Sequence, residues 1–160
     1  MCRWYITDII FMKKIGVLLF LAMFCGICCA QNVPAGYVDL GLPSGTLWKK
    51  TSETNYHDYN SAIKKYGGSL PTKKQWEELK SVCDWTWSGK GYQIVGPNGQ
   101  SIFLPAAGVG NEGVGKDGKY WSSTSLDDYT AWSIDFDKNG AVIKESVRGK
   151  KASVRLVISQ

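Results

Sequence analysis

Residues 101–160 constrain the fold of this chain more than any other feature. They consist of short runs of aromatic and β-branched residues, separated by Gly, Asn and Asp. Such runs at short intervals are typical of consecutive antiparallel strands. Two Asn-Gly turns, within 96–99 and 137–140, have the composition of tight hairpins. We therefore expect strands on both sides of each turn, and closing strands at 141–147 and 152–158.

A first helix is predicted near residues 57–66. Tyr56, Tyr59, Ile63 and Tyr66 recur at helical spacing, and a pair of glycines follows as a stop signal. The only histidine, His57, is placed on the polar side of this helix, where a surface or capping role is more plausible than a catalytic one.

A second helix is predicted near residues 73–83. Thr72 can cap its start, and Gln75 can complete a capping box. Its apolar face is expected to carry Trp76, Leu79, Val82 and Cys83. Upstream, residues 37–48 are interpreted as two short strands around a Pro-Ser-Gly turn. The expected fold class is α+β, with two helices packed on a twisted antiparallel sheet.

The first thirty residues have the pattern of a secretory signal peptide. Met12-Lys13-Lys14 precedes an apolar run at 15–29, and Ala30-Gln31 offers a small-residue cleavage site. Residues 1–11 are interpreted as an over-extended reading frame. A short lead-in at 31–36 and a single domain at 37–160 follow. The expected location is secreted, periplasmic or on the outer-membrane surface, and the alternatives are a retained membrane anchor or a lipid on Cys28 or Cys29.

Charge and cysteine content exclude several function classes. The formal net charge is +5, of which residues 1–30 carry +2, and the remaining +3 is too mild to indicate nucleic-acid binding. Four of the five cysteines lie within 1–30, which leaves only Cys83. One cysteine cannot form an internal disulfide, so a buried core thiol is expected there.

Metal and cofactor motifs are weak. Residues 135–140 match the opening of a calcium loop, but its twelfth position holds Ser146 where a bidentate Glu is needed. A hairpin turn is favoured, calcium remains a weak alternative, and no other cofactor is expected. The glycine-rich stretch 108–118 is interpreted as a flexible surface loop. Trp85 and Trp87 should point the same way from one strand, as core residues in preference to a sugar platform.

Taken together, many segments resemble the Fibrobacter-type major paralogous domain. These segments are 37–48, 70–72, 76–79, 85–87, 91–92, 96–99, 102–108, 120–124 and 153–157. The resemblance implies a C-type-lectin-like fold, similar to that of the formylglycine-generating enzymes and common in secreted proteins and lipoproteins of gut Bacteroidetes. The pair of active-site cysteines of those enzymes is not matched, since only Cys83 remains. The Glu-Pro-Asn calcium motif of sugar-binding lectins is not matched either, since Gly96 stands in place of the Glu.

The expected function is that of a non-enzymatic module that binds a glycan or a protein surface at the cell surface through its loops. A degenerate enzyme of the formylglycine-generating class and a structural component of the cell envelope are the alternatives. No nucleic-acid partner is expected, and membrane contact is expected only through an N-terminal anchor. The candidate ligand-binding residues lie in two loops and are Asn111, Glu112, Asp117, Asp127, Asp128 and Tyr129.

Overall fold

The computed structural model describes residues 32–110 and 112–160. Residues Val33–Gln160 form one compact unit. The predicted signal peptide and the candidate residue Asn111 therefore lie outside the described residues. In the part that is described, neither helix has the length and hydrophobicity of a bilayer-spanning segment.

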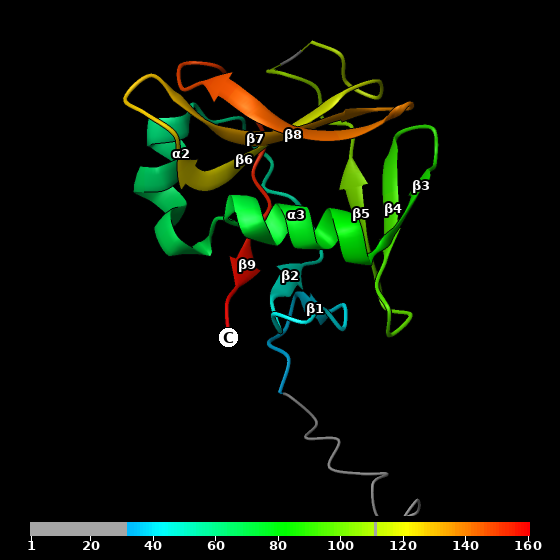
Figure 1. Ribbon diagram of the computed structural model, residues 1–160. Coiled ribbons are helices and arrows are strands. Elements are labelled where there is room, and N and C mark those ends of the chain that lie inside the picture. Colours follow the sequence, from blue (N-terminus) through cyan, green and yellow to red (C-terminus); the bar gives the residue numbers. More distant parts are fainter. Residues whose placement is uncertain (1–31, 111) are drawn as a thin grey trace, which may run out of the picture. The chain divides into compact units, whose positions relative to one another are not determined.

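The unit Val33–Gln160 has the predicted α+β composition, but the single sheet that we expected is wrong. The described residues form three antiparallel sheets of three strands each (Figure 1). The first contains β1 (Tyr37–Asp39), β2 (Leu47–Lys49) and β9 (Val157–Ile158). The second contains β3 (Asp84–Trp87), β4 (Gly91–Val95) and β5 (Ser101–Pro105). The third contains β6 (Gly118–Ser125), β7 (Thr130–Asp137) and β8 (Gly140–Val147).

Helix α2 (Tyr59–Tyr66) begins two residues later than predicted, and a 3-10 turn, η1 (Gly67–Ser69), follows it. Asp58 caps the helix by accepting a hydrogen bond from the Ser61 backbone N–H at 2.9 Å. His57 therefore precedes the helix, and its predicted place on the helix's polar side is wrong. Its backbone exchanges hydrogen bonds with Ala152, at 2.9 and 3.0 Å.

Helix α3 (Lys73–Val82) confirms the predicted capping box. The Thr72 hydroxyl accepts from the Gln75 backbone N–H at 3.2 Å, and the Gln75 side chain accepts from the Thr72 N–H at 2.8 Å. Trp76 and Leu79 are fully buried, and the apolar face continues onto Cys83, which is also buried. Val82 was expected on that face but is 37% exposed. The buried positions 76, 79 and 83 follow an i, i+3, i+7 stripe that Val82 does not share.

The third sheet is covered on both faces. Successive strand residues point to opposite faces, so Tyr120 and Trp121 enter different hydrophobic clusters. Tyr120 joins the larger cluster, to which α3 contributes Trp76. Trp121 joins a smaller cluster with Tyr59 of α2 and the segment that follows β8. This sheet is therefore the central layer of the unit.

The predicted closing strand at 152–158 is mostly wrong. Only β9 is a strand, and it pairs with β2 through Trp48 and Val157. The preceding residues cross from the third sheet to the first, and Ser153 bridges Tyr120 on the way. Within this crossing, Arg155 is fully buried. Its guanidinium donates to the backbone carbonyl of Lys49 at 2.7 Å and to that of Phe103 in β5, so one side chain connects the first and second sheets.

Candidate functional site

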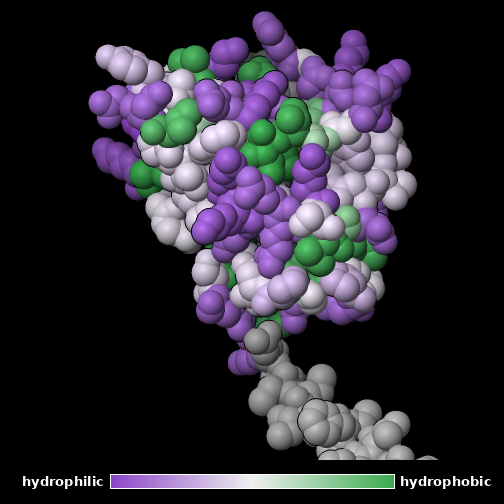
Figure 2. All heavy atoms as spheres, viewed as in Figure 1, coloured by the Kyte–Doolittle hydropathy of each residue, from purple (hydrophilic) through white to green (hydrophobic). Residues whose placement is uncertain are grey.

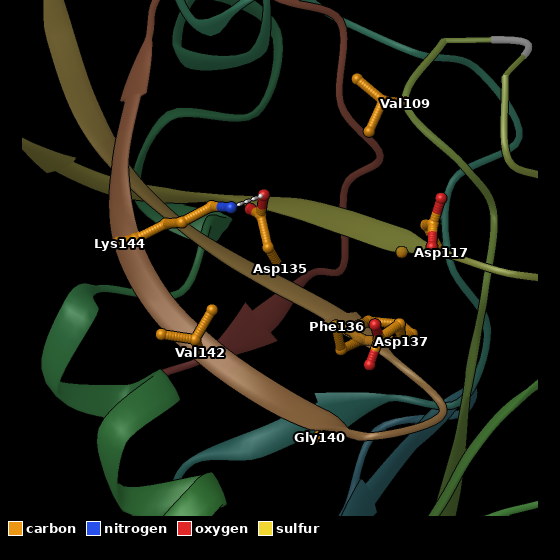
Figure 3. A pocket seen from close by; sticks show the side chains of 9 residues that line it. Val109, Asp117, Asp135, Phe136, Asp137, Gly140, Val142 and Lys144 are labelled. Carbon is orange, nitrogen blue, oxygen red and sulfur yellow. Dashed lines mark ion pairs between the residues drawn. The ribbon is translucent and has the colours of Figure 1, made fainter.

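Two adjacent hollows open between the β7–β8 hairpin and the glycine-rich loop, at the end of the third sheet where β6 begins. The first has a volume of about 340 Å³ and the second of about 370 Å³. Asp117 of the loop and Asp137 of the hairpin line both hollows. Figure 3 shows the first hollow, with Val109 and Asp117 facing the hairpin residues. Because the hollows share two carboxylates, we treat them as one groove with two compartments.

Backbone hydrogen bonds across its base shape the glycine-rich loop. The Gly108 N–H donates to the Asp117 carbonyl at 2.7 Å, and the Gly115 N–H donates to the Ala106 carbonyl at 2.7 Å. Gly108 has φ +80°, and a Cβ there would overlap the Glu112 carbonyl. The loop is therefore at the surface, as predicted, and its own backbone holds Asp117 at the edge of the groove.

The two shared carboxylates differ in their surroundings. The exposed Asp117 side chain makes no hydrogen bond or ion pair with any residue that the structure describes. Asp137 accepts from the Asn139 backbone N–H at 2.7 Å. That hydrogen bond holds the pKa of Asp137 below its usual value. Asp117 is thus an acceptor without a partner, beside a second carboxylate that is ionised at neutral pH.

A polar network lies behind the first compartment. Asp135 pairs with Lys119 at 2.8 Å and with Lys144 at 3.0 Å (Figure 3 marks the second pair). Lys119 is buried and also contacts the Ser146 hydroxyl at 2.6 Å. Burial lowers the pKa of Lys119, and the hydrogen bond to Asp135 opposes that shift. Neither Lys119 nor Asp135 was among the predicted site residues, because their pairing depends on the register between β6 and β7.

Trp87 forms a wall of the second compartment. It is half-buried, and its indole meets the ring of Tyr92 edge-on, with centroids 5.2 Å apart. Trp85 contacts the same tyrosine at 5.3 Å. Both tryptophans therefore pack against the core from one face of β3, as predicted, and Trp87 also reaches the groove.

Most of the predicted ligand-binding residues lie elsewhere. Asp127, Asp128 and Tyr129 form the β6–β7 turn, at the opposite end of β6 and roughly 20 Å from its start by strand geometry. The Asp127 carboxylate accepts from the backbone N–H groups of Tyr129 at 2.7 Å and Thr130 at 2.6 Å, which lowers its pKa. Glu112 is exposed and lines neither hollow. Of the predicted residues that are described, only Asp117 lines the groove.

The structure also describes the predicted calcium-loop residues and the Cys83 thiol. Residues 137–140 form the predicted hairpin turn, and the described residues contain no group of three ligands that could hold a metal ion. Cys83 lines a separate hollow of about 290 Å³. Burial raises the pKa of its thiol to about 11, so the thiol is protonated at neutral pH.

Comparison with known proteins gives one result. The family described as Domain of unknown function (DUF8237) matches residues 77–157. This span begins within α3 and includes the second and third sheets, the groove and the start of β9. No curated protein and no solved structure matches the chain. The chain therefore belongs to the DUF8237 family.

Proposed function

We propose that this protein is a secreted or surface-attached, non-enzymatic module that binds a glycan in the groove shared by Asp117 and Asp137. One observation carries the proposal: the Asp117 carboxylate, on the wall between two hollows, has no partner among the residues that the structure describes. A C-type-lectin-like assignment of the fold belongs to the same proposal, and its support is the resemblance of the sequence segments.

The groove has groups that suit a sugar. Ionised carboxylates accept hydrogen bonds only, and sugar hydroxyls are donors. Asp117 and Asp137 supply such acceptors where the compartments meet, and the Trp87 indole offers an apolar ring surface in the second compartment. Lys144 lies at the far side of the first compartment. A few polar groups with an aromatic wall are typical of sites that fix a ligand's orientation.

The pKa directions of Asp137 and Cys83 support a binding role in preference to catalysis. A general acid in glycoside hydrolysis needs a carboxyl group whose pKa is raised, whereas the pKa of Asp137 is lowered by its hydrogen bond to Asn139. The raised pKa of Cys83 likewise disfavours a thiolate nucleophile. These directions favour a binding module over the enzymatic alternative.

A protein surface is the second candidate ligand, and a different site favours it. Tyr129 is 80% exposed, on a turn that the Asp127 carboxylate fixes. A rigid, exposed tyrosine is a common anchor in protein recognition. This surface and the groove lie at opposite ends of β6, so separate substitutions can test them.

Glycan-array screening of the purified protein tests the proposal, with affinities of the hits then measured by calorimetry. Asp117→Ala should weaken binding tenfold or more, because a charge-assisted hydrogen bond contributes about 1.5–3 kcal/mol. Trp87→Ala should weaken it as well. Asp128→Ala is the matched control, since it removes an exposed carboxylate outside the groove. Absence of any glycan hit, or equal loss in Asp117→Ala and Asp128→Ala, would contradict the proposal.

A further inference from the structure

Strand β8 has one edge without a partner among the described residues. It is an outer strand of the third sheet, and it pairs with β7 along its whole length. The opposite outer strand, β6, is covered by the segment around Ser153. The Trp121 backbone N–H donates to the Ser153 carbonyl at 3.1 Å, and the Ser153 backbone N–H donates to the Lys119 carbonyl at 2.9 Å. Nothing equivalent lies beside β8 in the described part of the chain (Figure 1).

The register identifies which backbone groups are free. The Arg148 N–H donates to the Tyr129 carbonyl, which continues the β7–β8 ladder. In an antiparallel pair, alternate residues bond to the partner strand. Even-numbered residues of β8 therefore face β7, and the odd-numbered ones direct their N–H and C=O groups outward. The free groups belong to Ala141, Ile143 and Glu145, together with the N–H of Val147.

Apart from the charged side chains of Lys144 and Glu145, this edge lacks the protection that exposed edges usually have. Strand β8 is eight residues long, contains no proline and pairs with β7 without a bulge. Its side chains Val142 and Val147 are 49% and 55% exposed. Long, regular and partly apolar edges are sites where another strand pairs.

A hollow lies against the start of the same strand. Its volume is about 290 Å³, and Gly140 and Ala141 form one wall. The other lining residues are Trp85, Tyr92 and Cys83, together with the charged Lys80 and Asp84. In the space-filling view, a hydrophobic patch interrupts the hydrophilic surface at the height of β8 and α3 (Figure 2). Free main-chain groups thus lie beside a hollow whose lining combines aromatic and apolar residues with two charged ones.

We propose that β8 binds an extended peptide segment of another protein, which pairs as a fourth strand and inserts an apolar side chain into this hollow. Strand addition of this kind takes affinity from main-chain hydrogen bonds and specificity from pockets for alternate side chains. The residue opposite Ala141 would point to the same face as Ala141, which lines the hollow.

Charge on β8 favours a different segment over a second copy of this strand. Two-fold pairing centred on Lys144 or on Glu145 would set two like charges directly opposite each other, which is destabilising. Pairing centred on Ile143 would bring the two Lys144 ammonium groups to diagonal positions. We therefore expect the bound segment to carry an acidic residue near Lys144 and a basic residue near Glu145.

The test is selection of linear peptides from a random phage-displayed library on the purified protein. Enriched peptides should alternate apolar and polar residues, with an acidic residue among the polar ones. Their binding should slow hydrogen exchange of the amides of Ala141, Ile143 and Glu145. Ile143→Pro removes one outward N–H and should reduce affinity at least tenfold. Ala141→Leu fills the hollow, keeps every amide and should reduce affinity similarly.

Val142→Leu is the matched control, because it enlarges the neighbouring side chain on the other face of β8. Circular dichroism establishes that each variant is folded. The proposal is overturned if no peptide is enriched, or if Ala141→Leu binds the enriched peptides as the unchanged protein does. It is also overturned if protection appears away from β8, or if ultracentrifugation shows a dimer that Ile143→Pro abolishes, since a second copy would then occupy the edge.

Discussion

At the scale of single residues, Arg155 is the side chain whose loss should matter most. Its guanidinium is fully buried, donates to two backbone carbonyls and keeps Nε without a partner among the described residues. Burial lowers its pKa to about 10, so it still carries its charge at neutral pH. We expect Arg155→Met to reduce the free energy of unfolding by about 3 kcal/mol, because two buried carbonyls lose their donor. Urea denaturation measures this, with Lys74→Met as the control that should change little, because the Lys74 side chain is exposed and contacts no charged or polar partner among the described residues.

Also at this scale, capping aspartates should set the acid stability. The Ser61 backbone N–H and then Lys151 lower the pKa of Asp58, and turn N–H groups lower those of Asp127 and Asp137. A lowered folded-state pKa contributes stability above the unfolded value of about 3.9 and loses it as pH falls through the folded value. The free energy of unfolding should therefore decrease below about pH 4. In Asp58→Asn, which keeps a capping oxygen, this decrease should be smaller. If the free energy of unfolding of Asp58→Asn fell with pH as much as that of the unchanged protein, Asp58 would not be a source of the acid sensitivity.

At the scale of elements, the junction between the glycine-rich loop and β6 is tightly constrained. A Cβ on Gly118 would overlap the buried Phe136 ring. Gly118→Ala should destabilise the fold by about 1–3 kcal/mol through overpacking, and it should weaken glycan binding because Asp117 is the adjacent residue. Gly149→Ala is the control, since its Cβ meets no atom within 4 Å. Thermal unfolding and the glycan titration measure the two effects, and equal behaviour of both variants would contradict the packing argument.

Local signals predicted the elements that local interactions determine. The Thr72–Gln75 capping box located α3, and the two Asn-Gly turns located both hairpins. The partition into three sheets was not predictable, because it depends on β9 pairing with β2 across the length of the domain. The same reason explains which site residues could be predicted. Asp117 could be selected from the composition of its loop, whereas the burial of Lys119 beside Asp135 depends on the register between β6 and β7.

At the scale of the whole unit Val33–Gln160, the shared central sheet should make unfolding cooperative. The larger cluster covers one face of the β6–β7–β8 sheet and the smaller cluster covers the other, so neither can melt without exposing the same strands. Labelling of Cys83, a residue that is 8% exposed, should follow the same urea midpoint as far-UV circular dichroism. Mass spectrometry of the Cys83 peptide distinguishes it from the other cysteines. Labelling well before the circular dichroism transition would show that the α3 end opens independently.

The pairing of β9 with β2 has a consequence for biogenesis. Val157 and Ile158 complete a sheet that begins at Tyr37, so the ribosome must release nearly the whole chain before that sheet can close. Arg155, which connects the first two sheets, is likewise made only after strands β1 to β8. Long-range closure of this kind slows folding. A nascent chain of this protein therefore keeps its first sheet open until Ile158 has left the ribosome.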